Sequence, residues 1–105
     1  MKFKIVFTPE AQDDLLELYE YIAERGSPER AMAYIARIEM VCMSLEMIPH
    51  RGTLREDLRR GLRVMGFERR VQIAFRVKSK SVAILRIFYG GRSVERAFRR
   101  SRKPD

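Results

Sequence analysis

The amino-acid sequence predicts an α+β fold in the order β-α-α-β-β-β, with an antiparallel sheet packed against an N-terminal helical hairpin. Two patterns carry this prediction. Residues 9–47 contain two apolar periodicities of helical spacing, and only a short Gly-Ser-Pro turn separates them. Within residues 61–92, apolar side chains recur with the period of two or in the short apolar runs that are typical of consecutive strands.

The first strand and the first helix follow directly from the N-terminal residues. Residues 3–7 alternate with period two and predict a short strand. Thr8 and Pro9 then supply an N-cap and a proline at the first helical position. Acidic side chains near that end stabilise the helix, because they interact favourably with the positive end of its dipole. Arg25 and Gly26 end this helix.

A second helix, over residues 28–47, begins almost immediately. Ser27 and Pro28 repeat the cap and the proline, and Pro49 and Gly52 close the helix. Two helices joined by so short a turn are expected to pack as an antiparallel hairpin.

The second helix carries two apolar stripes on opposite sides. One should pack on the sheet or on the first helix, and it comprises Ala31, Tyr34, Ile35, Ile38, Val41, Cys42 and Leu45. The other is either internal as well or a soft docking groove for a partner helix. Its members are Met32, Ala36, Met40, Met43 and Met47.

The strands of the C-terminal half carry a row of arginines. Residues 71–77 alternate, residues 78–81 form a polar turn, and residues 82–89 are nearly all apolar, as in a central strand. The apolar side chains already provide a core, so we expect that the scaffold needs none of the arginines for folding. A surface that meets anions is therefore indicated at Arg63, Arg69, Arg70, Arg76, Arg86 and Arg92.

The charge distribution supports that interpretation. Residues 1–50 hold 5 Lys and Arg against 9 Asp and Glu, a net charge of −4, whereas residues 51–105 hold 17 against 5, a net charge of +12. A basic half of this kind is typical of proteins that bind nucleic acid or an acidic protein, although a merely solvated surface is the alternative. No single strand carries an aromatic pair flanked by basic side chains, so a stacking platform for bases is not expected and a plain DNA- or RNA-binding module is the less favoured class.

A chain of 105 residues is long enough for one core, and we expect a single domain over residues 1–98 with a basic tail over residues 99–105. Cys42 lies in an apolar helical stretch and is interpreted as a buried structural thiol. We expect no cofactor, no metal site and no membrane contact. A cytoplasmic location is expected, because the N-terminus has no apolar secretory region.

Six local motifs follow one another along about residues 2–92. They are Phe7-Thr8-Pro9-Glu10-Ala11-x-x-Asp14-Leu15, Ser27-Pro28-x-x-Ala31, Leu45-x-x-x-Pro49-x-x-Gly52, Gly61-Leu62-Arg63, Ile73-Ala74-Phe75-Arg76-Val77 and Ile84-Leu85-Arg86-Ile87-Phe88-Tyr89-Gly90-Gly91-Arg92. Taken in this order, they resemble the RelE/ParE toxin superfamily of bacterial type II toxin–antitoxin modules. The helical hairpin and the Phe-Tyr-Gly-Gly-Arg ending favour the ParE-like branch.

The RelE-like branch implies mRNA cleavage on the ribosome. Such cleavage needs a group that activates the ribose 2′-hydroxyl, a proton donor and cations for the phosphorane. His50 is interpreted as incidental, and Glu68 as a local ion-pair partner of Arg69 and Arg70. Tyr89 is either a reactive group or a ring packed at the end of the sheet. If the chain is a nuclease, its candidate catalytic residues are Arg63, Arg76, Arg86 and Tyr89.

The ParE-like branch implies growth inhibition through DNA gyrase, with trapping of cleaved DNA and without known catalysis. A basic face that lacks a convincing acid/base pair favours this non-enzymatic mode, and a RelE-like ribosome-dependent endoribonuclease is the alternative. The candidate target-binding residues are Arg63, Arg69, Arg70 and Arg92.

The resemblance also implies a cognate antitoxin, ParD-like, with a ribbon-helix-helix domain and an acidic, amphipathic C-terminal segment. That segment would fold as it wraps the toxin in a hetero-oligomeric complex. The methionine stripe can accept an amphipathic helix, and arginines can bind carboxylates in a bidentate manner. The candidate antitoxin-binding residues are Met32, Ala36, Met40, Met43, Met47, Arg76 and Arg86.

Overall fold

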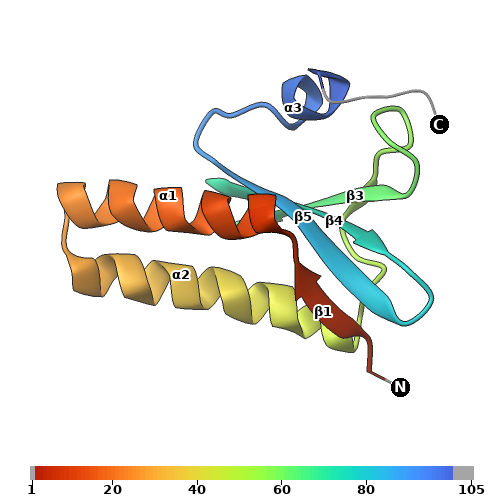
Figure 1. Cartoon of the computed structure of the whole chain (residues 1–105), viewed down its shortest axis with the longest axis horizontal. Helices are drawn as coiled ribbons and strands as arrows, with labels where there is room; N and C mark the ends of the chain where they lie inside the picture. Colours follow the sequence, from red (N-terminus) through yellow and green to blue (C-terminus); the bar gives the residue numbers. More distant parts are fainter. Residues whose placement is uncertain (1, 101–105) are drawn as a thin grey trace.

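One mixed sheet, in the order β1-β5-β4-β3-β2, organises the computed structural model, which describes residues 2–100 (Figure 1). The strands are β1 (Lys4–Phe7), β2 (Thr53–Leu54), β3 (Leu62–Phe67), β4 (Val71–Val77) and β5 (Ser81–Tyr89). The α+β class and the predicted β-α-α-β-β-β order are confirmed. The sheet is not wholly antiparallel, however, because β1 pairs with β5 in parallel, and the two-residue strand β2 was not predicted.

The predicted helical hairpin is confirmed as α1 (Pro9–Arg25) and α2 (Pro28–Met43), which lie side by side and antiparallel (Figure 1). Both caps form as expected. The Thr8 hydroxyl accepts a hydrogen bond from the Ala11 N–H, and the Ser27 hydroxyl accepts one from the Arg30 N–H. The second helix was predicted to reach residue 47, but it ends at residue 43 and continues as a 3₁₀ turn, η1 (Ser44–Glu46).

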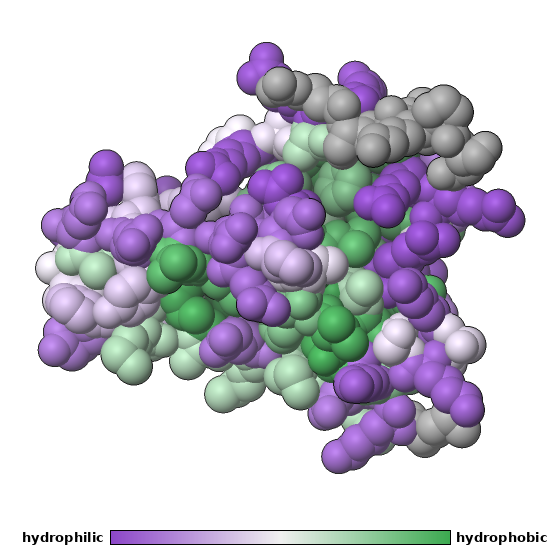
Figure 2. Space-filling view, viewed as in Figure 1, coloured by the Kyte–Doolittle hydropathy of each residue, from purple (hydrophilic) through white to green (hydrophobic). Residues whose placement is uncertain are grey.

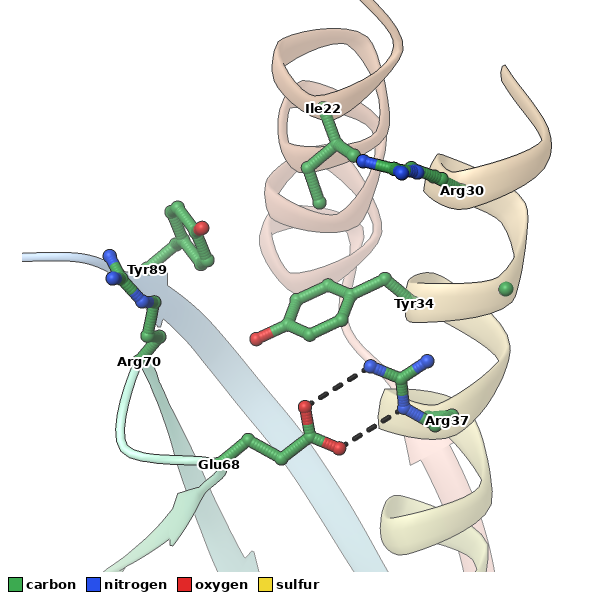
Figure 3. A pocket seen from close by; sticks show the side chains of 8 residues that line it. Ile22, Arg30, Tyr34, Arg37, Glu68, Arg70 and Tyr89 are labelled. Carbon is green, nitrogen blue, oxygen red and sulfur yellow. Dashed lines mark hydrogen bonds and ion pairs between the residues drawn. The ribbon is translucent and has the colours of Figure 1, made fainter. Parts of the chain in front are cut away.

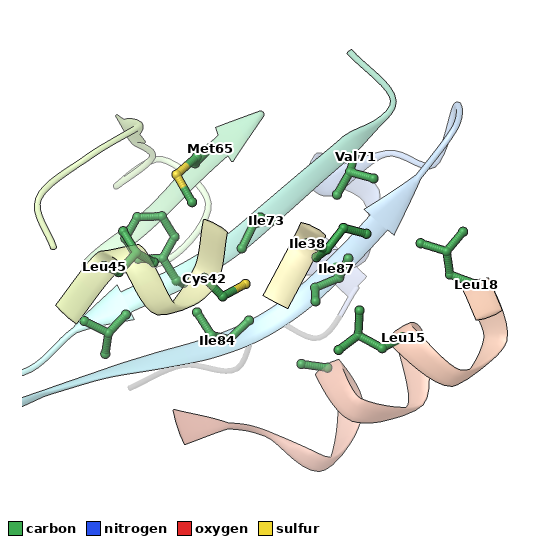
Figure 4. Packing of buried hydrophobic residues seen from close by; sticks show 13 residues of the cluster. Leu15, Leu18, Ile38, Cys42, Leu45, Met65, Val71, Ile73, Ile84 and Ile87 are labelled. Atoms are coloured by element: carbon green, nitrogen blue, oxygen red, sulfur yellow. The ribbon is translucent and has the colours of Figure 1, made fainter. Parts of the chain in front are cut away.

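The main core fills the space between the hairpin and one face of the sheet (Figure 4). Leu15 and Leu18 enter it from α1, Ile38 and Cys42 enter from α2, and Phe75 of β4 is fully buried. The inward stripe of α2 therefore packs as predicted, and close packing of these side chains supplies most of the hydrophobic stabilisation.

A short C-terminal helix, α3 (Val94–Arg100), covers the opposite face of the sheet and was not predicted. Val94 and Phe98 pack there with Phe88 of β5, and the Phe88 and Phe98 rings lie edge to face with centroids 6.3 Å apart. The helix includes the first two residues of the expected tail 99–105, whereas residues 101–105 lie outside the described part of the chain.

The edge of β5 is protected by two different elements along its length. Strand β1 pairs only with residues 81–84 of β5. Beyond them the N-terminal half of α1 takes over: the Thr8 hydroxyl donates to the Leu85 carbonyl at 2.9 Å, and the Ile87 N–H donates to Asp14 Oδ2 at 2.8 Å. These contacts satisfy backbone groups that would otherwise form an open sheet edge. Within residues 2–100, no helix is long and apolar enough to cross a membrane.

Candidate functional site

The five residues of the second stripe on α2 and just after it form an exposed surface, which we call the methionine face: Met32, Ala36, Met40, Met43 and Met47. The exposed fractions of its methionines range from 42% to 71%. Moderately hydrophobic residues gather along the lower margin of the molecule, where α2 runs (Figure 2). The alternative that both stripes of α2 are internal is therefore wrong, and the methionine face is open to a partner.

The expectation that folding needs none of the arginines is wrong for Arg86. Its guanidinium binds the carboxylate of Asp14 in a bidentate manner, with Nε–Oδ2 at 2.8 Å and Nη2–Oδ1 at 3.0 Å. Asp14 is only 7% exposed, and it also accepts the backbone N–H of Ile87. These hydrogen bonds raise the pKa of Arg86 above its ordinary value. Arg86 is thus a structural residue that anchors α1 to β5.

The other candidate arginines lie in four separate settings. Arg92 pairs loosely with Glu17 of α1 at 3.3 Å, and Arg63 donates to the Arg51 carbonyl. Arg76 packs along Gly61, which adopts a φ of +73° and has no side chain; a Cβ there would lie 3.2 Å from Arg76 Nε. The remaining two, Arg69 and Arg70, are exposed in the turn between β3 and β4.

The expected local ion pair between Glu68 and its neighbouring arginines is wrong. Glu68 instead reaches across the molecule to Arg37 of α2, which donates two hydrogen bonds of 3.1 Å to its two carboxylate oxygens. Both side chains are about half exposed, so the pair adds little to stability, but it fixes the turn beneath the hairpin.

The four candidate nuclease residues do not converge on one surface. The register pairs Arg63 with Phe75 and Tyr89 with Val71, so both belong to the sheet face beneath the hairpin. Arg76 is paired with Leu62 and Arg86 with Ala74, so those two belong to the face beneath α3. His50 lies elsewhere: its ring packs in an edge-to-face arrangement with the Phe3 ring, with centroids 6.5 Å apart.

A cleft between the hairpin and the β3–β4 turn brings Tyr89 together with residues that the sequence did not single out (Figure 3). It has a volume of about 460 Å³. Arg70 and Tyr89 form one wall, and Tyr34 and Arg37 form the other. The Tyr34 and Tyr89 rings are nearly perpendicular, with centroids 6.2 Å apart. Burial, followed by the proximity of Tyr89, raises the pKa of Tyr34, so its hydroxyl stays protonated.

Two of the residues missed at the sequence level had a detectable signal. Asp14 lies on the apolar face of α1, three residues after Ala11 and four before Leu18, where a carboxylate needs a buried partner. Tyr34 lies on the inward stripe of α2 with a hydroxyl that needs a polar environment. Their partners could not be read from the sequence, because Arg86 and Tyr89 are more than 50 residues away.

Cys42 is fully buried in the main core, as predicted. Burial raises the pKa of its thiol to about 12, so the group is protonated at neutral pH and acts as a small apolar side chain. Among residues 2–100, no three His, Cys, Asp or Glu side chains gather in a way that could hold a metal ion.

Comparison with known proteins gives a consistent set of similarities. A family model described as the ParE toxin of the type II toxin–antitoxin system parDE matches residues 5–94. The structure is similar to a chain of the chromosomal ParDE system from P. aeruginosa, with 28% identity, a TM-score of 0.74 and coverage of 85% of this chain and 97% of that one.

The fold is also similar to that of a chain in the RelBE2 toxin–antitoxin complex from Mycobacterium tuberculosis. The identity there is 22%, the TM-score is 0.58, and 85% of this chain and 99% of that one are covered. No curated protein sequence matches.

Proposed function

The chain belongs to the ParE toxin family of type II toxin–antitoxin systems, and we propose that it inhibits DNA gyrase without catalysis and is neutralised by a cognate ParD-like antitoxin. A target of this kind implies action in the cytoplasm. The RelE-like alternative, a ribosome-dependent endoribonuclease, makes a different demand on the site, because it needs an acid/base pair beside its phosphate-binding cations.

The main support for a non-enzymatic mode of action is that the candidate nuclease residues are divided between the two faces of the sheet. Arg63 and Tyr89 lie on one face, and Arg76 and Arg86 lie on the other. A group that transfers a proton must lie within about 3 Å of its target, directly or through one water. Tyr89 is in ring contact with Tyr34, and Arg86 is engaged by Asp14. This arrangement supports a toxin that acts by binding.

The methionine face supports the antitoxin half of the proposal. A row of exposed methionines at helical spacing is a suitable surface for an amphipathic helix, since the thioether side chains adapt to the partner's shape. Arg76, which makes no ion pair within residues 2–100, is suited to an acidic extended segment of the same antitoxin. Arg86 is less suited to antitoxin binding than expected, because its guanidinium is already paired with the carboxylate of Asp14.

Two assays of the purified protein, free of antitoxin, test the proposal. In the first, supercoiling of relaxed plasmid by gyrase is measured with increasing protein, and cleaved plasmid is measured after denaturation. We expect supercoiling to fall and linear plasmid to accumulate. In the second, mRNA is followed in a translation extract, and we expect it to stay intact. Cleavage of mRNA at codons, with gyrase unaffected, would contradict the proposal and favour the endoribonuclease.

A further inference from the structure

Four aromatic rings from four different elements form a continuous row across the molecule. Tyr21 of α1 contacts Tyr89 of β5 with ring centroids 5.7 Å apart. Tyr89 contacts Tyr34 of α2, which in turn contacts Phe67 of β3, each at 6.2 Å. No single strand within residues 2–100 carries such a set, so these rings come together only in the tertiary fold.

Arginines accompany this row along its length. The guanidinium of Arg25 lies 3.8 Å from the centre of the Tyr21 ring, and that of Arg37 lies 5.0 Å from the centre of the Tyr34 ring. Two adjoining clefts, of about 460 and 380 Å³, share Tyr89 and Arg70 in their walls. Together they form one trough, which we call the tyrosine trough.

After its ion pairs are counted, the tyrosine trough has a net positive charge. Its three carboxylates each have a guanidinium partner: Asp14 with Arg86, Glu17 with Arg92 and Glu68 with Arg37. Arg30 and Arg70 also line the trough, and within residues 2–100 neither guanidinium has a carboxylate partner. An anion that enters the trough therefore meets two uncompensated cations beside aromatic rings.

We propose that the tyrosine trough binds single-stranded nucleic acid, with bases against the rings of Tyr34 and Tyr89 and phosphates on Arg30 and Arg70. Every base has a π-face, and alternating rings and cations are the recurring means by which proteins hold single strands without reading sequence. A duplex is disfavoured because its bases are stacked and cannot reach the rings. This binding is additional to the antitoxin contacts and does not require gyrase inhibition, although it shares Arg70 with the candidate target-binding residues.

An acidic peptide is the main competing ligand, and the rings distinguish the two. Carboxylates would use Arg30 and Arg70 but would leave the faces of Tyr34 and Tyr89 without a planar partner. A base adds stacking, so loss of a ring should weaken a nucleic acid far more than a peptide.

Intrinsic fluorescence gives a direct readout, because the chain has no tryptophan and its four tyrosines include three in the trough. The antitoxin-free protein is titrated with single strands of about 12 nucleotides, oligo(dT) and oligo(U), a site size typical of such grooves. We expect quenching of the tyrosine emission with both, after correction for absorption by the nucleic acid. The ratio of the two affinities then distinguishes DNA from RNA.

Substitutions locate the binding, measured by anisotropy of a labelled strand. Tyr89→Leu should weaken binding about tenfold, whereas Tyr89→Phe, which keeps the ring and safeguards the fold, should bind as the wild type does. Arg70→Ala should lower the slope of log K against log salt by about 0.7. Arg60→Ala is the matched control: it removes the same charge from an exposed loop that does not line the trough, and it should leave the affinity for the strand within about twofold of the wild type.

Three results would overturn the proposal. The first is absence of quenching with a folded protein. The second is equal binding of a duplex of the same charge, or an equal loss in Arg60→Ala and Arg70→Ala, since either would mean diffuse attraction to a basic surface. The third is tighter binding of an acidic peptide of about 12 residues that is insensitive to Tyr89→Leu, which would mark a peptide groove.

Discussion

Asp14 shows how one residue on the apolar face of a helix can decide where that helix lies. Its carboxylate accepts two hydrogen bonds from Arg86 and one from the Ile87 N–H, so each oxygen of a nearly buried group has a donor. A carboxylate in an apolar environment is costly without such partners. The pair also replaces strand pairing beyond the end of β1, and so it joins the hairpin to the sheet.

Replacement of Asp14 by Ala should lower the free energy of unfolding by about 2–4 kcal/mol. Breaking a fully buried ion pair usually costs about 3–5 kcal/mol. We expect a somewhat smaller loss here, because the Arg86 side chain is about one third exposed and water can solvate it. Urea unfolding followed by circular dichroism measures it. Asp13→Ala, at the exposed neighbouring position, should change stability by less than about 0.5 kcal/mol. Equal stability of Asp14→Ala and the wild type would contradict a structural role for the pair.

Cys42 should react with a thiol reagent only when the protein unfolds. Burial raises the thiol pKa from its ordinary 9.0 to about 12, so the folded state binds the proton more tightly than the unfolded state. The resulting stabilisation is complete below about pH 9 and is lost as the pH rises towards 12. The test is to label the thiol at pH 8 in increasing urea, and we expect the extent of labelling to follow the unfolding curve. Rapid labelling of the native protein would show that the thiol is accessible.

At the scale of the element, features set by neighbouring residues were predicted correctly, whereas features that depend on contacts between distant residues were missed. The caps of α1 and α2, the turn between them and the antiparallel β3–β4–β5 meander follow from neighbouring residues, and they were predictable. Helix α3 was missed because it is short and mostly charged, and among its residues 94–99 only Val94 and Phe98 are buried by contact with the sheet. The parallel pairing of β1 with β5 was missed because it joins opposite ends of the chain.

Replacement of Met40 and Met43 by Glu tests the methionine face of α2. Both side chains are exposed, so the circular dichroism spectrum and the melting temperature should stay close to those of the wild type. Affinity for the cognate antitoxin should fall at least tenfold, about what the loss of one anchor residue causes. Calorimetric titration measures it. A double change of Leu16 and Leu54 to Glu, which are exposed elsewhere, should leave the affinity unchanged; an equal loss there would contradict a localised docking surface.

At the scale of the whole molecule, charge is divided between the elements. The acidic residues of α1 face a remainder that is strongly basic, as the two halves of the sequence predicted. What the sequence could not specify is which arginines are already neutralised. Arg86 and Arg92 meet carboxylates of α1 that lie 72 and 75 residues earlier in the chain, so only the folded structure separates structural cations from available ones.

Growth inhibition should survive the change of Tyr89 to Phe. The variant lacks only a hydroxyl and keeps the ring contacts with Tyr21 and Tyr34. A nuclease that used this hydroxyl for proton transfer would lose roughly 10²–10⁴-fold in rate. Colony counts after induction, with expression verified by immunoblot, measure the effect. Full loss of toxicity in a folded variant would contradict the non-enzymatic mode.

The pairing of the first strand with the last has a consequence for synthesis on the ribosome. Thr8 finds its acceptor on Leu85, 77 residues later, and at about 5–20 residues per second that interval takes about 4–15 s. During that time the hairpin has been made, but the strand that covers its apolar face has not emerged. The nascent chain therefore cannot complete its fold until its translation is nearly finished.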